Sequence, residues 1–149
     1  MLRSVLMSLV AGQRAMTPLA ALAMAARRGD LPTDAPACDL LARPAVALGA
    51  AALAAGEMVG DKLPSAPDRI VLPGLVARSV TAAFAGAVLA APDRRAEAAV
   101  LAAVTAIGAS YIGFNLRVRA MRRFGQTSTG LVEDAVVLGG ALAIARQRG

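Results

Sequence analysis

Long apolar runs separated by short polar stretches dominate this 149-residue chain. Five apolar segments can be marked, and each is long enough for a helix: Val5–Ala26, Pro44–Gly60, Leu72–Ala91, Ala98–Leu116 and Leu131–Ala145. The fourth has 19 residues without a charge, close to the roughly 20 apolar residues that a bilayer-spanning helix needs. The other segments reach that length only if their charged residues lie at membrane depth or at the interface.

The stretches between these segments predict loops, because they are rich in proline, glycine and charge. They cover residues 29–36, 62–73, 91–95 and 117–130. Short buried helices of a soluble bundle are the alternative, but such helices need a polar face, and Ala45–Ala55 and Ala82–Ala91 are apolar all round. We therefore expect an all-α fold: an integral membrane bundle of about five short helices, forming a single transmembrane helical domain over residues 1–149.

The first segment is interrupted between Gly12 and Pro18, which predicts a broken first helix. It also resembles the third segment, because Arg14-Ala-Met-Thr17 is echoed by Arg78-Ser-Val-Thr81. The pattern indicates an internal two-helix repeat, as found in many transporters. Chance similarity in an alanine-rich chain is the alternative. Simple alternation of spans makes the repeats parallel, and an inverted pair would need a re-entrant or broken segment.

Composition supports a lipid environment: 57% of residues are hydrophobic, only 17% are charged, and mean hydropathy is +0.60. The 37 alanines and 14 glycines permit close helix packing in lipid, although compositional bias explains part of the alanine count. Histidine is absent and Cys38 is the only cysteine, which excludes a His/Cys zinc site and a His-based triad. We expect no cofactor, no metal and no enzymatic activity.

The net charge of +6 comes from arginines placed between apolar runs, not along one stripe. This distribution favours lipid head groups over nucleic acid as the partner. The expected location is the bacterial inner membrane, with several spans and homo-oligomeric assembly. If five spans alternate with Arg14 and Arg78 embedded, seven basic residues fall on each side, so the total gives no orientation. The densest cluster, 117–123, is expected in the cytoplasm together with the N-terminus.

Arg14 and Arg78 are the first candidates for function, because a charged side chain at membrane depth is costly. Thr17 and Thr81 lie three residues on, hence on the same face if the helix is continuous. Two such faces suit an anion or phosphate pocket. The alternative is that both arginines form structural ion pairs with carboxylates.

Acidic residues provide the second group of candidates. Glu57 and Asp61 share one helix face, each directly after a glycine of a G-x-x-x-G arrangement, and suit a proton relay or a cation site. Alternatively, Glu57 pairs with one of these two arginines while Asp61 and Lys62 lie at the interface. Glu133 and Asp134 are expected in the first turn of the fifth helix, where acidic groups suit the helix dipole, and one of them is expected to turn inward toward one of the same two arginines.

Four stretches together resemble one bacterial membrane family, the one called domain of unknown function 4126. They are Gly12–Leu19 (G-x-R-A-x-T-P-L), Gly56–Pro64 (G-E-x-x-x-D-K-L-P), Pro73–Arg78 and Val132–Ala135. The resemblance covers nearly the whole chain and implies a multi-span membrane protein. It implies no catalytic role, but it places the family's polar residues at the positions singled out above.

The sequence therefore predicts a small transporter or channel-like protein that moves a solute or ion along buried arginines and carboxylates. A structural or accessory membrane protein, packed against a partner or lipid head groups, is the main alternative. A lipid-head-group enzyme or flippase-like protein is the third.

Overall fold

Every regular element in the described residues, 1–62 and 71–147 of this computed structural model, is helical. The elements in chain order are α1 (Leu2–Gln13), α2 (Thr17–Arg28), α3 (Cys38–Leu41), α4 (Pro44–Gly60), α5 (Leu72–Val88), the 3-10 turn η1 (Pro92–Arg94), α6 (Arg95–Phe124) and α7 (Gln126–Arg146). The all-α prediction is confirmed. Most of the predicted loop at 62–73 lies outside the described residues.

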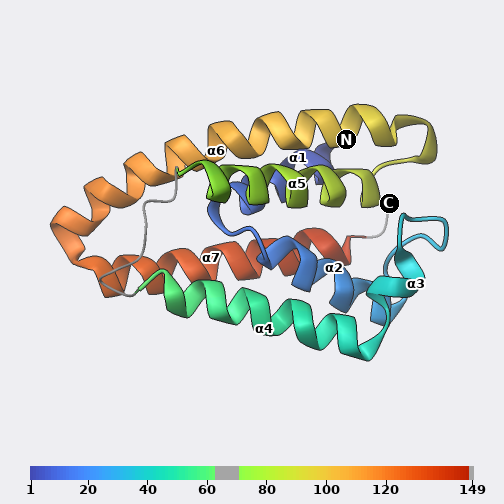
Figure 1. The fold of residues 1–149 in the computed structure, drawn as a ribbon, viewed down its shortest axis with the longest axis horizontal. Helices are drawn as coiled ribbons and strands as arrows, with labels where there is room; N and C mark the ends of the chain where they lie inside the picture. Colours follow the sequence, from blue (N-terminus) through green and yellow to red (C-terminus); the bar gives the residue numbers. More distant parts are fainter. Residues whose placement is uncertain (63–70, 148–149) are drawn as a thin grey trace.

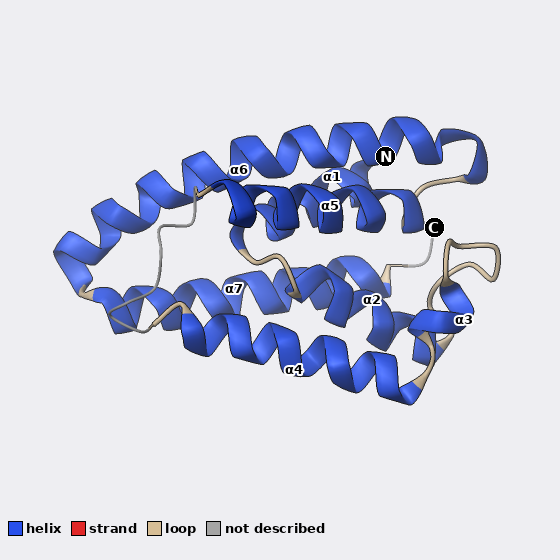
Figure 2. Ribbon diagram, viewed as in Figure 1, coloured by secondary structure: helices blue, strands red, loops and turns tan. Residues whose placement is uncertain are grey.

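The helices form two layers (Figures 1 and 2). One layer holds α1, α5 and α6, which contact one another closely, and the other holds α2, α4 and α7, with α3 at its end. The chain passes from one layer to the other at the α1–α2 break and at the corner between α6 and α7 (Figure 1). The candidate site lies between the α1–α2 break and the α6–α7 corner.

The α1–α2 pair is a helical hairpin, not a single span. α1 runs from the end that carries the N-terminus toward the interior, and α2 runs back to the same end (Figure 1). Arg14 is extended (φ −142°, ψ 114°), and Pro18 lies in the first turn of α2. Proline suits a helix start and disfavours a helical residue before it. Each helix has 12 residues, or roughly 18 Å at a rise of about 1.5 Å per residue.

The break predicted between Gly12 and Pro18 is thus present, but the expected counterpart is not broken. Arg78 lies inside the continuous helix α5, so the two segments differ in conformation where the repeat was expected. Arg14 and Thr17 also lie on opposite sides of the break and do not share a helix face, contrary to the prediction.

The start of α1 and the end of α7 lie at the same end of the molecule, which we call the terminal end, opposite the α6–α7 corner (Figure 1). The N-terminus and the 117–123 cluster, expected together on the cytoplasmic side, therefore lie at opposite ends of the molecule, because the hairpin returns the chain to its starting end. The element ends gathered at the terminal end carry seven arginines: Arg3, Arg27, Arg28, Arg43, Arg94, Arg95 and Arg146.

Two helices are long and apolar enough to cross a membrane: Pro92–Phe124, which joins η1 to α6, and Gln126–Arg146. α4 and α5 are apolar but shorter. The predicted basic loop at 117–130 is wrong, because that stretch is helical except at Gly125 (φ +82°). Arginine is a good helix former, so a run of arginines does not by itself end a helix.

Small residues bring α6 against α1 and α5. Its buried face includes Ala98, Ala102, Ala106 and Ser110. A Cβ on Gly12 would lie 2.7 Å from the Ala106 carbonyl oxygen, and a Cβ on Gly86 would lie 2.7 Å from that of Ala98. Ser110 Oγ donates to the Gly12 carbonyl at 2.9 Å. Small-residue packing is therefore present.

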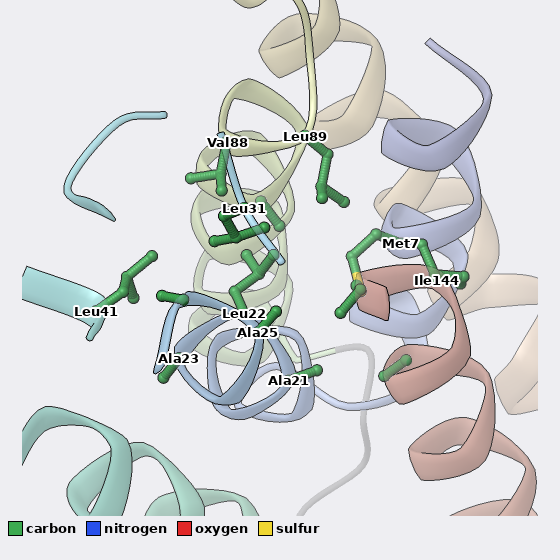
Figure 3. Close-up of a cluster of buried hydrophobic side chains, with 14 of the residues drawn as sticks. Met7, Ala21, Leu22, Ala23, Ala25, Leu31, Leu41, Val88, Leu89 and Ile144 are labelled. Atoms are coloured by element: carbon green, nitrogen blue, oxygen red, sulfur yellow. The ribbon is translucent and has the colours of Figure 1, made fainter. Parts of the chain in front are cut away.

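Close packing does not occur at the predicted G-x-x-x-G arrangement of α4. A Cβ on Gly56 or on Gly60 would meet nothing within 4 Å among the described residues. The larger side chains gather instead between the two layers, where Met7, Leu22, Leu31, Val88 and Ile144 belong to one buried cluster (Figure 3).

The outer faces of α4 to α7 are strongly apolar. Exposed large side chains include Leu48 and Leu53 on α4, Val76 and Val80 on α5, and many on α6 and α7. On α4 the stretch Pro44–Gly56 has no polar or charged side chain at all. Contiguous exposed apolar surface of this kind marks a lipid or protein contact.

Candidate functional site

Arg14 is the most deeply buried charge in the described part of the chain. It ends α1 at the break, and its side chain is 1% exposed. Its guanidinium reaches Asp61 Oδ2 at 2.8 Å and Asp134 Oδ1 at 2.6 Å. A guanidinium stays charged and suits planar contacts with carboxylates. The prediction that Arg14 pairs with carboxylates is confirmed.

Each of the two aspartates joins Arg14 to a second cation. Asp134 also accepts from Lys62 Nζ, and Asp61 also accepts from Arg117 Nη1. Arg117 in turn reaches Glu133 Oε2 at 3.1 Å and donates to the Asp61 carbonyl at 3.2 Å. The expectation that one of the adjacent acids on α7 turns toward Arg14 or Arg78 is met by Asp134, whereas Glu133 contacts Arg117, which was not among the predicted partners.

These six side chains form one row of alternating sign, which we call the charge ladder: Lys62, Asp134, Arg14, Asp61, Arg117 and Glu133. Three cations face three carboxylates, so the ladder is formally neutral. It links α1, the end of α4, α6 and α7. Along α6 and α7 it lies about 12–14 Å from the corner at Gly125, at about 1.5 Å per residue.

Glu57 is not part of the ladder but lies beside it, at the start of α2. Its two carboxylate oxygens accept from the backbone N–H groups of Ala15 and Met16, at 2.8 and 2.9 Å. A carboxylate at a helix N-terminus satisfies free donors and suits the dipole. Among the described residues, Glu57 does not pair with Arg14 or Arg78 as predicted. Instead it reaches from α4 to the backbone N–H groups that directly precede α2.

Replacing Glu57 with glutamine should destabilise the fold by about 1–2 kcal/mol. The amide keeps one acceptor for the two donors at the break and loses the charge that favours the helix start. Unfolding of the purified protein in detergent measures the loss, with the exposed Glu97→Gln as the matched control. A loss no larger than that of the control would show that α2 does not depend on this cap.

Within residues 1–62 and 71–147, no direct hydrogen bond or ion pair joins Arg78, Thr17 or Thr81 to a ladder residue. Arg78 is buried on α5, which contributes no ladder residue. Thr81 bonds its own helix, donating to Ala77 and Arg78 carbonyls. Thr17 is fully buried, and its hydroxyl has no hydrogen-bond partner among the described residues. The contact between Thr81 and Arg78 is to the backbone carbonyl and not to the guanidinium.

Two ladder residues were missed by sequence reasoning. Arg117 was placed in a loop and Lys62 at the interface, yet Arg117 is 8% exposed and Lys62 is 23% exposed. A signal for Arg117 does exist in the sequence. Spacings of three and four residues run from the buried alanines of α6 through Gly113 to Arg117, so the same face leads to it. Glu133 and Asp134 lie well inside α7, which begins at Gln126, and not in its first turn.

A cavity of about 410 Å³ opens beside the ladder, between α1, α6 and α7. Its walls are mainly aliphatic, and two ladder residues, Arg117 and Glu133, border it. Within residues 1–62 and 71–147, no group of His, Cys, Asp and Glu has a geometry that could hold a metal ion. The chemistry on offer is that of paired charges next to an apolar space.

Fold and site together define an all-helical protein with a neutral buried charge ladder and two helices that could cross a membrane. Comparison with known proteins found no relative: no family model, no curated protein and no solved structure matches the chain.

Proposed function

We propose that this chain is a multi-pass inner-membrane transport protein in which the charge ladder gates a pathway for a small solute or ion. In this proposal α4 to α7 cross the bilayer, and the α1–α2 hairpin enters from the terminal end and returns. The terminal end, with its seven arginines, faces the cytoplasm, in keeping with the excess of basic residues on that side of membrane proteins. Assembly as a homo-oligomer would cover the apolar face of α4.

The proposal rests on one observation. Helix α1 ends inside the fold at Arg14, and the Arg14 side chain is part of the charge ladder. Irregular backbone at membrane depth is tolerated where it is buried in protein or lines a cavity. Broken helices of this kind hold substrates and coupling ions in transporters. Intramembrane charges are expensive and commonly mark ion or proton pathways.

The ladder offers a simple way to open. Asp61 and Asp134 each contact two cations, so neutralising either carboxylate would leave two cationic side chains without their shared counter-charge. Those cations would then repel one another and attract an anion. Binding of a solute ion to one of these charged groups would thus be coupled to the movement of α1 against α6 or α7.

Flux measurements in proteoliposomes test this function. Wild type, Asp61→Asn and Arg78→Ala are compared at matched amounts of folded protein, with a pH-sensitive dye and a panel of small anions and cations. We expect a flux of one or more solutes in wild type that Asp61→Asn changes at least tenfold, a factor that corresponds to about 1.4 kcal/mol. The exposed Glu97→Gln should behave as wild type. A flux that Asp61→Asn leaves unchanged would remove the ladder from the pathway.

A second function is favoured by the pairing itself. Every charge of the ladder contacts an opposite charge, as expected of a structural lock in an accessory membrane protein. That function predicts no flux for any solute in the panel and loss of folded protein in ladder variants. The same preparations therefore separate the two functions.

A further inference from the structure

The cavity beside the ladder is a groove with one apolar end and one polar end; we call it the α1–α6–α7 groove. Leu9, Ala109 and Ile112 line its apolar part, together with Val136 and Val137. The part nearer the α6–α7 corner is lined by Arg117, Thr129 and Glu133 together with Ala120, and the amide side chain of Gln13 also lines the groove. From Ala109 to Ala120 the groove follows α6 for about 16 Å at about 1.5 Å per residue.

The groove is continuous with the exposed apolar surface of the two helices that could cross a membrane. Ile112 is 64% exposed, Leu116 59% and Val136 68%, and all three line it. Its volume of about 410 Å³ lies within the roughly 300–1,000 Å³ of ordinary small-molecule sites. An occupant of matching chemistry is therefore a flexible apolar chain that enters from the side.

The charge beyond the polar end indicates what that chain carries. The charge-free stretch Ala98–Leu116 covers about 28 Å of helix, close to the thickness of the hydrocarbon core of a bilayer. The last turns of α6 would then lie at head-group depth. They carry three exposed arginines, Arg119, Arg122 and Arg123, while the cation inside the groove, Arg117, is already engaged by Asp61 and Glu133.

We propose that the α1–α6–α7 groove binds one acyl chain of an anionic phospholipid, whose head group is held by Arg119 and Arg123, the exposed arginines closest to the groove side of α6. Exposed arginines attract anionic head groups at a membrane surface, and the aliphatic walls hold the chain by burial. The proposal rests on the membrane location given above but not on transport. The bound lipid would contact Arg117 and Glu133, the two residues at one end of the charge ladder.

Lipid retention tests this directly. The protein is reconstituted in vesicles of equal phosphatidylglycerol and phosphatidylcholine, extracted in mild detergent, and its bound phospholipid is counted by mass spectrometry. We expect phosphatidylglycerol to remain bound in preference to phosphatidylcholine. Ala120→Phe, which fills the groove, should abolish retention. Each head-group arginine that is replaced by glutamine should lower the preference for phosphatidylglycerol by about fivefold. This factor corresponds to the attraction of one basic side chain to an anionic surface.

Matched controls separate this site from general lipid contact. Val104→Phe adds the same ring on the exposed face of α6 outside the groove, and glutamine at Arg27 and Arg28 removes two charges at the opposite end. Both should retain the lipid as wild type does. Equal retention in Ala120→Phe, or equal retention of the two lipids, would overturn the proposal. So would a dimer that only the groove variants dissociate, since a second copy would then be the occupant.

Flotation of the vesicles gives the remaining readout. Protein that floats with the vesicles but retains no lipid refutes the groove site alone. Protein that does not insert refutes the membrane location and the transport proposal with it.

Discussion

Replacing Arg14 with methionine will destabilise the protein by about 3–5 kcal/mol, the usual cost of removing one partner from a buried ion pair. Methionine keeps most of the volume, so the loss reports the charge and not a cavity. Without Arg14 the ladder splits in two, and one negative charge remains in excess near the α1–α2 break. Chemical unfolding in detergent, followed by circular dichroism, measures the effect.

The matched control is Arg94→Met. Arg94 also forms an ion pair, with Glu97 at 3.3 Å, but both side chains are more than half exposed. Exposed pairs contribute about 0–1 kcal/mol. Adding Asp61→Asn to Arg14→Met restores neutrality and should recover part of the loss, giving a coupling energy of about 0.5–3 kcal/mol. Equal losses in Arg14→Met and Arg94→Met would mean that the ladder does not hold the helices together.

The second large effect is expected at the close contacts of α6. Gly12→Ala places a Cβ 2.5 Å from that of Ala109, and Gly86→Ala places one 2.7 Å from that of Ala102. Neighbouring backbone atoms are equally near, so helices must separate. Each change should destabilise the fold by about 1–3 kcal/mol, measured as a lower thermal midpoint in detergent.

The same substitution at Gly108 should stabilise the protein instead of destabilising it. Gly108 lies on α6, and a Cβ there meets nothing within 4 Å. Alanine is favoured over glycine inside a helix by roughly 0.5–1 kcal/mol, so Gly108→Ala should raise the midpoint. If all three variants shifted in one direction, helix propensity and not close packing would govern these positions.

Apolar patterning predicted the helices well, because their length and composition are local properties. The segment beginning at Pro44 starts and ends where α4 does, and the segment beginning at Leu72 starts with α5. The corner was misplaced because four arginines were taken as a loop, whereas only Gly125 interrupts the helix. A short element such as α3, with four residues, leaves no periodic signal.

Only part of the candidate site could be predicted from the sequence. Arg14, Asp61, Glu133 and Asp134 were suspected because each is a charge next to an apolar run. Which charges meet depends on tertiary geometry, and α1 turns back where a continuous span was expected. That reversal brings Arg14 to Asp61 and leaves Arg78 on a helix outside the ladder. Glu57 was assigned to an arginine because a broken backbone with free N–H groups is invisible in a residue list.

The position of α1 also bears on how the chain assembles. Ser4 Oγ donates to the Gly86 carbonyl and Ser110 Oγ to the Gly12 carbonyl, so α1 packs against helices that are made about 80 to 100 residues later. Contacts so distant in sequence form late, because the loop between them must first be closed. We therefore expect α1 to reach its final packing only after α5 and α6 have been made, and Arg14 to reach Asp134 only after α7 has followed.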